Sequence, residues 1–324
     1  MPFMEAINLT KTYEISRGWR QSENVLAVDQ VSLSMEDGQT IGIVGESGCG
    51  KSTLLRLLLC LEKPSSGKLL HRGKDLTSLP DRQLHFYRRR VQAVFQDPAS
   101  SLNQRFSVRN IILEPLINFG LAESKHEADK TVGNILEQVG LRSDDMHRFP
   151  HEFSGGQQRR IAIARAISVK PDLVICDEAT SGLDVSVQAQ ILNLLSDLQE
   201  AFNINYLFVS HDLAAVRYLC PEIAVMYAGR IVEFLPTAQT AVHPYTQALL
   251  AGDCSGTGTT SANAAPFKSN TFPAVLPGEP PDASDYPPGC RFHPRCAEVK
   301  DICREVIPEL KEVAPGQKAA CHLA

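Results

Sequence analysis

Eight residues near the amino end have the composition of a phosphate-binding loop. They read Gly45-Glu46-Ser47-Gly48-Cys49-Gly50-Lys51-Ser52, and Thr53 follows. The glycines let backbone N–H groups curl around an anion, Lys51 can reach the β and γ phosphates of a nucleotide, and the Ser52 hydroxyl can bind Mg²⁺. A glycine-rich turn with a chance Gly-Lys-Ser is the alternative. The apolar run Ile41–Val44 before the loop and the helical pattern Ser52–Leu61 after it favour the nucleotide site.

Two acids end a second apolar run, Leu173–Cys176. A carboxylate at this end of a strand can hold Mg²⁺, which we assign to Asp177, and Glu178 can then polarise an attacking water as general base. His211, at the end of the run Tyr206–Val209, can contact the γ-phosphate. Without the phosphate loop, the Asp-Glu pair would be interpreted as a solvated surface pair.

Gln96 closes the apolar run Val91–Phe95. A neutral amide at that place can touch both Mg²⁺ and the attacking water, whereas an ordinary surface glutamine is the plainer interpretation.

A second glycine-containing turn reads Phe153-Ser154-Gly155-Gly156-Gln157 and precedes a helical pattern. The free N–H groups of such a helix start can bind phosphate. The alternative is structural, because Ser154 is a good N-cap and Gln157, three residues later, completes a capping box.

The elements that must position these residues follow an α/β pattern. Short apolar runs alternate with helical patterns up to residue 235, as in a largely parallel sheet with crossover helices such as Val187–Phe202. Residues 97–168 carry helical patterns, including Glu127–Val139 and Gln157–Ile167, with little strand signal. We interpret this stretch as an inserted helical subdomain.

Two further stretches break the pattern. Arg17–Asn24 is polar, holds Trp19 and is interpreted as an exposed hairpin tip or loop. Gly252–Asn270 is rich in Gly, Ser, Thr and Ala, which is typical of a flexible linker. The predicted organisation is a main domain over 1–235, a helix and linker over 236–271, and a Pro-rich, Cys-bearing domain over 272–324.

Composition excludes several classes of protein. The chain of 324 residues has 43% hydrophobic residues and a formal charge of −5, so it can form a core but has no global basic field for nucleic acid. Its longest apolar candidate, Leu54–Leu61, is too short to cross a membrane. The first residues have no basic and apolar leader, so we expect a cytosolic location.

In a reducing compartment, clustered cysteines suggest a metal site before disulfides. Four of the nine cysteines lie near the carboxyl end: Cys290, Cys296, Cys303 and Cys321. Their spacing is longer than the C-x2-C pairs of many zinc sites, which argues mildly against a zinc ribbon. Four thiolates can also hold an iron–sulfur cluster, and free or buried thiols are the third alternative.

The order of the phosphate loop, Gln96, the Ser-Gly-Gly-Gln segment, the acidic strand end, Ser181-Gly182-Leu183-Asp184 and His211 resembles the ATP-binding subunit of an ABC transporter. The resemblance implies a P-loop NTPase (RecA-like) α/β core with an antiparallel β subdomain and an inserted helical subdomain, plus a small Cys-rich C-terminal extension. In that family two such domains pair head to tail, and each ATP lies between the phosphate loop of one and the signature segment of the other.

The resemblance also implies a role for each matching residue. Tyr13 would stack on adenine, although an aromatic in an early strand is more often core. Ser154, Gly155, Gly156 and Gln157 would bind phosphate of the partner's ATP, Asp184 would lie in the D-loop, and Lys51, Gln96, Glu178 and His211 would be catalytic. Mg²⁺ would be held by Ser52, Gln96 and Asp177. Phe153 stands where leucine is usual, and because both are apolar we expect little effect.

Further motifs resemble the oligopeptide/dipeptide/nickel importer ATPases. They are Val94-Phe95-Gln96-Asp97-Pro98, the run 184–190, His243-Pro244-Tyr245, and Cys290-Arg291-Phe292-His293-Pro294-Arg295-Cys296. Similar tails in this family carry a [4Fe–4S] cluster, so the resemblance implies that the four C-terminal cysteines hold one as a structural staple.

The function implied is MgATP hydrolysis that powers import of di- or oligopeptides. The implied partners are a second ATPase subunit, identical or paralogous, two transmembrane permeases and an extracytoplasmic binding protein, with the chain peripheral on the cytoplasmic face of the inner membrane. Nickel, metal-chelate or antimicrobial-peptide uptake stays open. A non-transport ABC ATPase and an exporter subunit are less favoured, because the chain shows neither a coiled-coil insertion nor a second ATPase domain, and its tail resembles the peptide importers.

Overall fold

The computed structural model describes residues 1–16, 22–121, 125–253, 276 and 278–324. Trp19 and most of the predicted linker 252–270 lie outside these residues. Contacts divide the chain into two compact units, of which unit 1 holds 1–35, 41–77 and 211–324 and unit 2 holds 36–40 and 78–210. The domain boundaries drawn from the sequence stay predictions.

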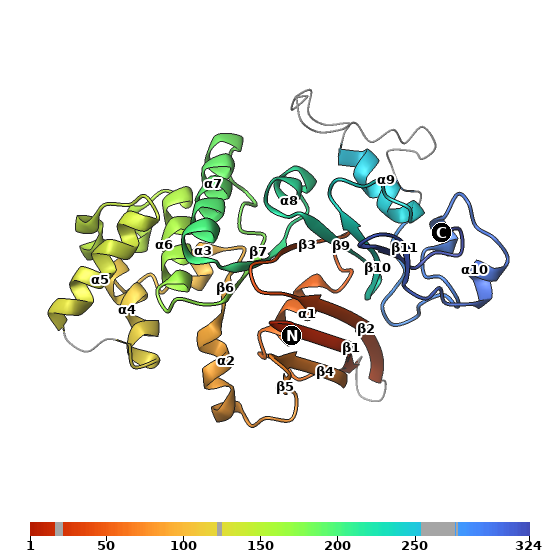
Figure 1. Cartoon of the computed structure of the whole chain (residues 1–324), viewed down its shortest axis with the longest axis horizontal. Coiled ribbons are helices and arrows are strands. Elements are labelled where there is room, and N and C mark those ends of the chain that lie inside the picture. Colours follow the sequence, from red (N-terminus) through yellow and green to blue (C-terminus); the bar gives the residue numbers. More distant parts are fainter. Residues whose placement is uncertain (17–21, 122–124, 254–275, 277) are drawn as a thin grey trace. The chain divides into compact units, whose positions relative to one another are not determined.

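Unit 1 contains an antiparallel sheet with the order β2-β1-β4-β5 (Figure 1). Its strands are β1 (Met4–Ser16), β2 (Ser22–Met35), β4 (Ser66–His71) and β5 (Lys74–Asp75). β1 pairs with β2 up to Ser16 and Ser22, so residues 22–24 of the predicted loop belong to β2, and the rest of that prediction, residues 17–21, lies outside the described residues.

The second group of strands in unit 1 follows the order β11-β12-β10-β9-β3. β3 (Thr40–Val44) runs parallel to β9 (Glu222–Tyr227), and β10 (Arg230–Pro236) is antiparallel to β9. β3 is buried along its whole length, which explains why its sequence is a continuous apolar run. The helices are α1 (Lys51–Leu58), α8 (Leu213–Leu219) and α9 (Pro244–Asp253).

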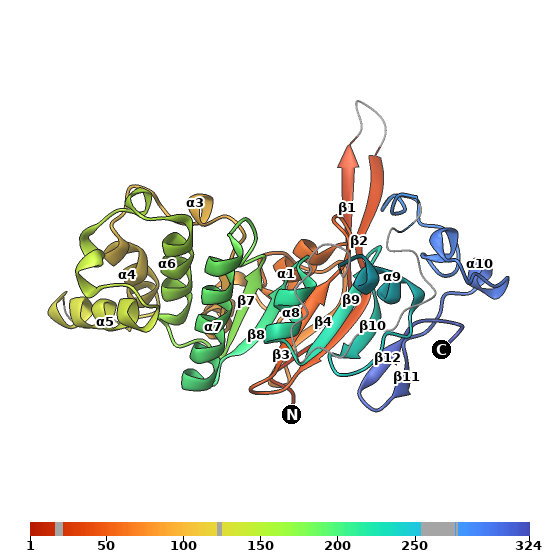
Figure 2. The ribbon, with the colours of Figure 1, turned by 90° about the horizontal axis from the view of Figure 1, so that it is seen from above.

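The C-terminal segment, residues 278–324, also belongs to unit 1. It holds the short helix α10 (Ile302–Glu305) and the strands β11 (Lys311–Ala314) and β12 (Gln317–Ala319). β12 pairs with β10 through Glu233 and Phe234, so this segment extends the sheet (Figure 2). Buried Glu233 reinforces the junction, because its carboxylate accepts hydrogen bonds from the Gln317 side chain and from the His243 backbone N–H.

Unit 2 contains three parallel strands in the order β8-β7-β6. They are β6 (Val91–Val94), β7 (Leu173–Asp177) and β8 (Asn205–Val209). The four strands predicted from apolar runs, these three and β3, are confirmed to within one residue at each end.

Unit 2 also contains the helices α2 (His85–Arg90), α3 (Pro98–Ser101), α4 (Val108–Asn118), α5 (Lys125–Gln138), α6 (Gly155–Ile167) and α7 (Val185–Phe202). Figure 2 shows α3, α4, α5 and α7 around α6. The described residues of the stretch 97–168 form helices and no strand, as its pattern predicts. In the described part of the chain, no helix combines the length and apolarity needed to span a membrane.

Candidate functional site

The phosphate loop, residues 45–52, passes so close to neighbouring backbone that two of its positions exclude a side chain. A Cβ on Gly45 would lie 2.1 Å from the carbonyl oxygen of Met226, and one on Gly50 would lie 2.2 Å from that of Ala27. Gly50 also has a φ of +106°, which L-residues with a Cβ rarely adopt. Gly45 and Gly50 are therefore required by the fold of unit 1 itself.

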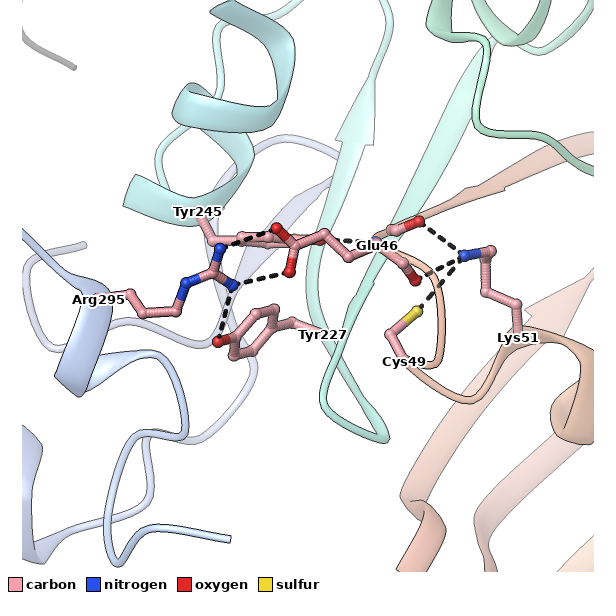
Figure 3. A network of polar contacts seen from close by, with 7 residues as sticks. Glu46, Cys49, Lys51, Tyr227, Tyr245 and Arg295 are labelled. Carbon is pink, nitrogen blue, oxygen red and sulfur yellow. Dashed lines mark hydrogen bonds and ion pairs between the residues drawn. The ribbon is translucent and has the colours of Figure 1, made fainter. Parts of the chain in front are cut away.

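Helix α1 starts at Lys51 without a side-chain cap and without an acidic residue in its first turn. Its first N–H groups and its partial positive charge are thus left for an anion. The Lys51 ammonium lies across the loop and donates to the carbonyl oxygens of Gly45 and Glu46 at 2.6 and 2.9 Å (Figure 3). Ser52 is exposed at the start of the helix.

Cys49 is buried in the same loop, 3.7 Å from the Lys51 nitrogen. Burial raises the pKa of its thiol, an effect that the nearby ammonium only partly opposes. The thiol is therefore a packing group of the loop at neutral pH.

Tyr13 on β1 lies beside α1. Its hydroxyl donates to Glu62 at 2.6 Å, and both Thr53 and Arg56 of α1 are within hydrogen-bonding reach of it. Burial is the main cause of its raised pKa, although the side chain keeps part of its surface exposed. A half-exposed ring next to the phosphate loop's helix is compatible with the predicted stacking on a base and does not belong to the closed core.

In unit 2, two residues predicted separately, Gln96 and Glu178, are brought together. The Gln96 amide nitrogen donates to the Glu178 carboxylate at 2.6 Å, although 82 residues separate them. Parallel pairing of β6 with β7 brings the carboxyl ends of both strands to the same edge of the sheet. Gln96 comes just after β6 and Glu178 just after β7, so both lie at that edge. The acid and the amide thus meet at Glu178, the residue that follows Asp177 at the end of β7.

The backbone of Glu178 is itself held in an uncommon conformation. Its φ is +49°, and its N–H donates to the carbonyl oxygen of Val209 at the end of β8. Left-handed backbone at a residue with a long side chain costs energy and occurs often at functional sites. Cys176, two residues before Glu178, is fully buried, and desolvation raises the pKa of its thiol to about 12.

The signature segment, residues 154–157, forms the start of α6. The capping box that the sequence offers as the structural alternative is present. The N–H of Gln157 donates to the Ser154 hydroxyl, and the N–H of Ser154 donates to the Gln157 side chain. Both caps leave the N–H groups of Gly155 and Gly156 at the helix start for another acceptor. Capping and anion binding are therefore compatible here.

Asp184 caps the next helix, α7. Its carboxylate accepts from the Val187 N–H at 3.0 Å and from the Ser186 hydroxyl at 2.7 Å, and these bonds lower its pKa. A Cβ on Gly156 would lie 2.6 Å from a methyl group of Val187, so the first turns of α6 and α7 pack closely.

Arg159 was missed by the sequence reasoning. It is buried in unit 2 and donates to the carbonyl oxygens of Phe95 at 2.7 Å and Ser181 at 3.4 Å. One guanidinium thus ties α6 to the residue before Gln96 and to the segment after Glu178, and burial lowers its pKa. A charged residue four or five positions into a helix gives no sign of burial in a single sequence.

The remaining predicted residues fall in unit 1. His211 is exposed, two residues beyond the end of β8, and Ser52 lies on α1. The roles inferred for them, as for the other site residues, stay predictions.

Three of the four C-terminal cysteines have raised pKa values. Burial raises the pKa of Cys290 to about 11, and the charges of Cys303, Cys321 and Cys296 add to this effect. Burial likewise raises the pKa of Cys296 and of Cys321. The thiols are neighbours, but among the described residues no group of three or more His, Cys, Asp or Glu side chains is arranged to hold a metal ion.

Comparison with solved structures identifies the fold. Over 72% of this chain, the structure matches 98% of the ATP-binding cassette MJ0796 bound to ADP and phosphate, with a TM-score of 0.65 and 30% sequence identity. CbiO1 of Clostridium perfringens, part of an ABC transporter complex, gives a TM-score of 0.61. The fold is the α/β cassette of a P-loop NTPase, and it carries the phosphate loop and signature segment described above.

Sequence comparison defines the family. The ABC transporter family matches residues 28–181, and the family "Oligopeptide/dipeptide transporter, C-terminal region" matches residues 262–303. The chain is 44% identical to the oligopeptide transport ATP-binding protein AppF of Bacillus subtilis and 42% identical to the di/tripeptide transport ATP-binding protein DppF of Pseudomonas aeruginosa, in each case over 99% of this chain and 97% of that protein. The chain belongs to the oligopeptide/dipeptide branch of the ABC transporter ATP-binding proteins, and its activity is ATP hydrolysis.

Proposed function

We propose that this ATPase powers the import of di- or oligopeptides through partner membrane subunits. Relatives that match it over nearly their whole length are named as peptide transport ATP-binding proteins, and the match includes the C-terminal region as well as the cassette. The observation that best supports ATP hydrolysis is the hydrogen bond from the Gln96 amide to the Glu178 carboxylate at 2.6 Å, directly after strand β7.

In the proposed mechanism, Glu178 accepts the proton of the attacking water and Gln96 orients this carboxylate. The left-handed backbone at Glu178, held by its N–H bond to Val209, sets the direction in which the carboxylate leaves β7. His211 would donate to the γ-phosphate, and Tyr13 would cover one face of the adenine.

The phosphate loop binds the triphosphate through its N–H groups, through α1 and through Lys51. Lys51 now donates to the loop's own carbonyl oxygens, so it must turn from them toward the β and γ phosphates when nucleotide binds. The Ser52 hydroxyl, the Gln96 amide and the Asp177 carboxylate offer the oxygen ligands that Mg²⁺ prefers. When bound there, Mg²⁺ would neutralise charge on the β and γ phosphates.

The signature segment would bind the γ-phosphate of ATP held by a second cassette. Its capped helix start keeps the N–H groups of Gly155 and Gly156 in place, and Asp184 would lie at the same dimer interface. Closing and reopening of such a head-to-tail dimer would drive the membrane subunits. The proposed partners are a second ATPase subunit, two permeases and an extracytoplasmic binding protein, and the proposed location is the cytoplasmic face of the inner membrane.

We also propose that Cys290, Cys296, Cys303 and Cys321 hold a [4Fe–4S] cluster. The support is that the charges of the other three cysteines contribute to the raised pKa of Cys290, and that the Cys290 N–H donates to the Cys303 carbonyl oxygen at 2.8 Å. Against it stands the lack of an assembled ligand group among the described residues. Iron analysis and visible absorption of the anaerobically purified chain test the proposal. Iron that is lost in Cys303→Ser would support it, and zinc or no metal would contradict it.

Uptake of labelled peptide tests the transport function. In a strain that lacks this chain, uptake of a labelled dipeptide or tetrapeptide should be lost, and should return with the wild-type chain but not with Glu178→Gln. Affinity purification of the tagged chain from membranes should recover two permeases. Loss of nickel uptake with peptide uptake unchanged, or recovery of ribosomes or DNA-repair proteins without permeases, would contradict the proposal.

A further inference from the structure

The C-terminal segment reaches the phosphate loop through one arginine. Both terminal nitrogens of Arg295 donate to the Glu46 carboxylate, at 2.7 and 3.0 Å, which is a two-bond ion pair between residues 249 positions apart (Figure 3). Glu46 is the second residue of the phosphate loop, directly beside the carbonyl oxygens that accept from Lys51. The loop is therefore contacted by a part of the chain that the cassette motifs do not include.

Arg295 is held in a tightly packed setting. It is 8% exposed, and one of its nitrogens also donates to the Tyr227 hydroxyl at 3.3 Å. Phe292, three residues earlier, is 2% exposed and packs against the rings of Tyr227 and Tyr245, with centroids 5.3 and 5.5 Å away. This aromatic cluster fixes the direction from which the guanidinium meets the carboxylate.

The backbone of Glu46 is held from the same side. Its N–H donates to the Tyr245 hydroxyl at 2.9 Å, so neither the N–H nor the carboxylate of this residue is free to turn toward a nucleotide. Arg295 and Tyr245, on the C-terminal segment and on α9, thus hold one residue of the loop at its side chain and at its backbone (Figure 3).

A second arginine gives a parallel connection. Arg291 donates to the Asp29 carboxylate and to the carbonyl oxygen of Ala228, and it stacks on Tyr286. Gly229 follows Ala228 in the chain, and its N–H donates to the carbonyl oxygen of Cys49 in the phosphate loop at 2.9 Å. Each arginine is adjacent in sequence to one of the clustered cysteines, Cys290 or Cys296.

Charge explains why the loop needs this partner. A carboxylate in a loop that binds a polyanion would repel the nucleotide unless a cation neutralises it. Arg295 supplies that cation from the far side, and its pKa is raised mainly by the hydrogen bonds to Glu46. A buried fork of two charge-assisted bonds also limits the motion of the loop.

From this geometry we infer that Arg295 is a positioning residue for nucleotide binding: it neutralises Glu46 and holds the phosphate loop, and thereby makes ATP affinity depend on the docked C-terminal segment. The inference rests on the proposed role of residues 45–52 as the phosphate site. It assigns to this segment a function toward ATP that does not require the cysteines to carry a metal.

Calorimetric titration of MgATP into the full-length chain tests this. Arg295→Gln should weaken binding about tenfold, because Glu46 is left charged and without its partner. The double variant Glu46→Gln/Arg295→Gln should return to within a few-fold of wild type, because the uncompensated charge is gone. In the assembled transporter, Arg295→Gln should raise KM for ATP and leave kcat nearly unchanged.

The matched control is Arg304→Gln, at an exposed arginine of the same segment, which should bind like wild type. If Arg295→Gln fails to fold, Arg295→Lys keeps the charge without the fork and should show an intermediate loss. Unchanged affinity in a folded Arg295→Gln, or a double variant as weak as the single one, would overturn the inference. Wild-type chain that binds no MgATP would instead overturn the phosphate-site assignment.

Discussion

The phosphate loop and the signature segment are both glycine-containing turns that open a helix, yet they are held in opposite ways. In the signature segment, Ser154 and Gln157 hold each other across three residues. In the phosphate loop, the residue next to the first glycine is held by Tyr245 and Arg295, 199 and 249 residues later. The first is stabilised locally, and the second depends on the folded carboxyl-terminal half of unit 1.

This difference predicts different responses to change. A locally capped helix start keeps its form when distant parts of the chain are altered, whereas a loop held by remote side chains transmits what happens to them. The proposed catalytic pair of unit 2 lies between these cases, because Gln96 and Glu178 are distant in sequence but follow neighbouring parallel strands.

The largest effect is expected at Glu178. Glu178→Gln should lower ATP turnover by about 10²–10⁴-fold, the range of general-base catalysis, and should leave MgATP binding intact because the phosphate loop is unchanged. Steady-state hydrolysis and calorimetric binding measure the two effects. Glu200→Gln, at an exposed acid of α7, is the matched control. Preserved hydrolysis in Glu178→Gln would exclude Glu178 as the base.

Acid should weaken the remote support of the phosphate loop. Burial lowers the pKa of His243 to about 4. The Nδ1 atom of His243 accepts a hydrogen bond from the Tyr245 N–H, and the backbone N–H of His243 donates to the Glu233 carboxylate. Between pH 6.5 and about 4 the unfolded chain takes up a proton that the folded chain does not. The free energy of unfolding should therefore fall as the pH falls through this window, by about 3 kcal/mol in total.

Denaturant unfolding at several pH values measures this slope. His243→Asn keeps an acceptor but does not titrate, so its slope should be shallower than that of wild type. His151→Asn, at an exposed histidine, should keep the wild-type slope. Equal slopes in wild type and His243→Asn would show that this histidine does not control the acid response.

The two glycines of the signature segment should respond oppositely to alanine. A Cβ on Gly156 would lie 2.6 Å from Val187, whereas the nearest atom to one on Gly155 is 4.0 Å away. Gly156→Ala should lose about 1–2 kcal/mol through overpacking, and Gly155→Ala should gain up to about 1 kcal/mol of helix propensity. Thermal unfolding compares them, and Gly156→Ala/Val187→Ala should recover the loss. Equal effects at both glycines would contradict the packing argument.

The smallest effects separate local from remote support directly. Ser154→Ala should cost about 1 kcal/mol of stability through the lost cap and leave MgATP affinity of the single chain unchanged. Tyr245→Phe removes the acceptor for the Glu46 N–H and should weaken MgATP binding a few-fold. Melting temperature and calorimetry distinguish the two. A loss of affinity in Ser154→Ala, with none in Tyr245→Phe, would reverse the comparison.

Much of this fold was predictable because its signals are local. Buried parallel strands such as β3 and β7 are short apolar runs, and the capping box at Ser154 is a spacing of three residues. The apolar runs predict the ends of these strands to within about one residue. The residue types of the phosphate loop likewise indicate their chemistry, since glycine, lysine and serine at that spacing have few other uses.

What escaped prediction depends on partners far along the chain. Nothing near Arg159 indicates that it is buried and bound to two carbonyl oxygens. From the sequence, Arg295 and Arg291 are only part of a cysteine-bearing tail, and Glu46 is only one residue of the predicted nucleotide-binding loop. Whether a charged side chain is exposed or paired is decided by segments that meet only in the folded chain.

The sequence by itself determined the identity of the chemical groups: a loop for phosphate, a carboxylate pair at a strand end, a capped signature helix and four clustered cysteines. The tertiary structure decided which of these groups depend on others. It joined Gln96 to Glu178 across parallel strands and Arg295 to Glu46 across 249 residues. The reason is physical: spacing along the chain specifies local hydrogen bonds, whereas charge pairing between distant residues requires the burial and direction that only packing supplies.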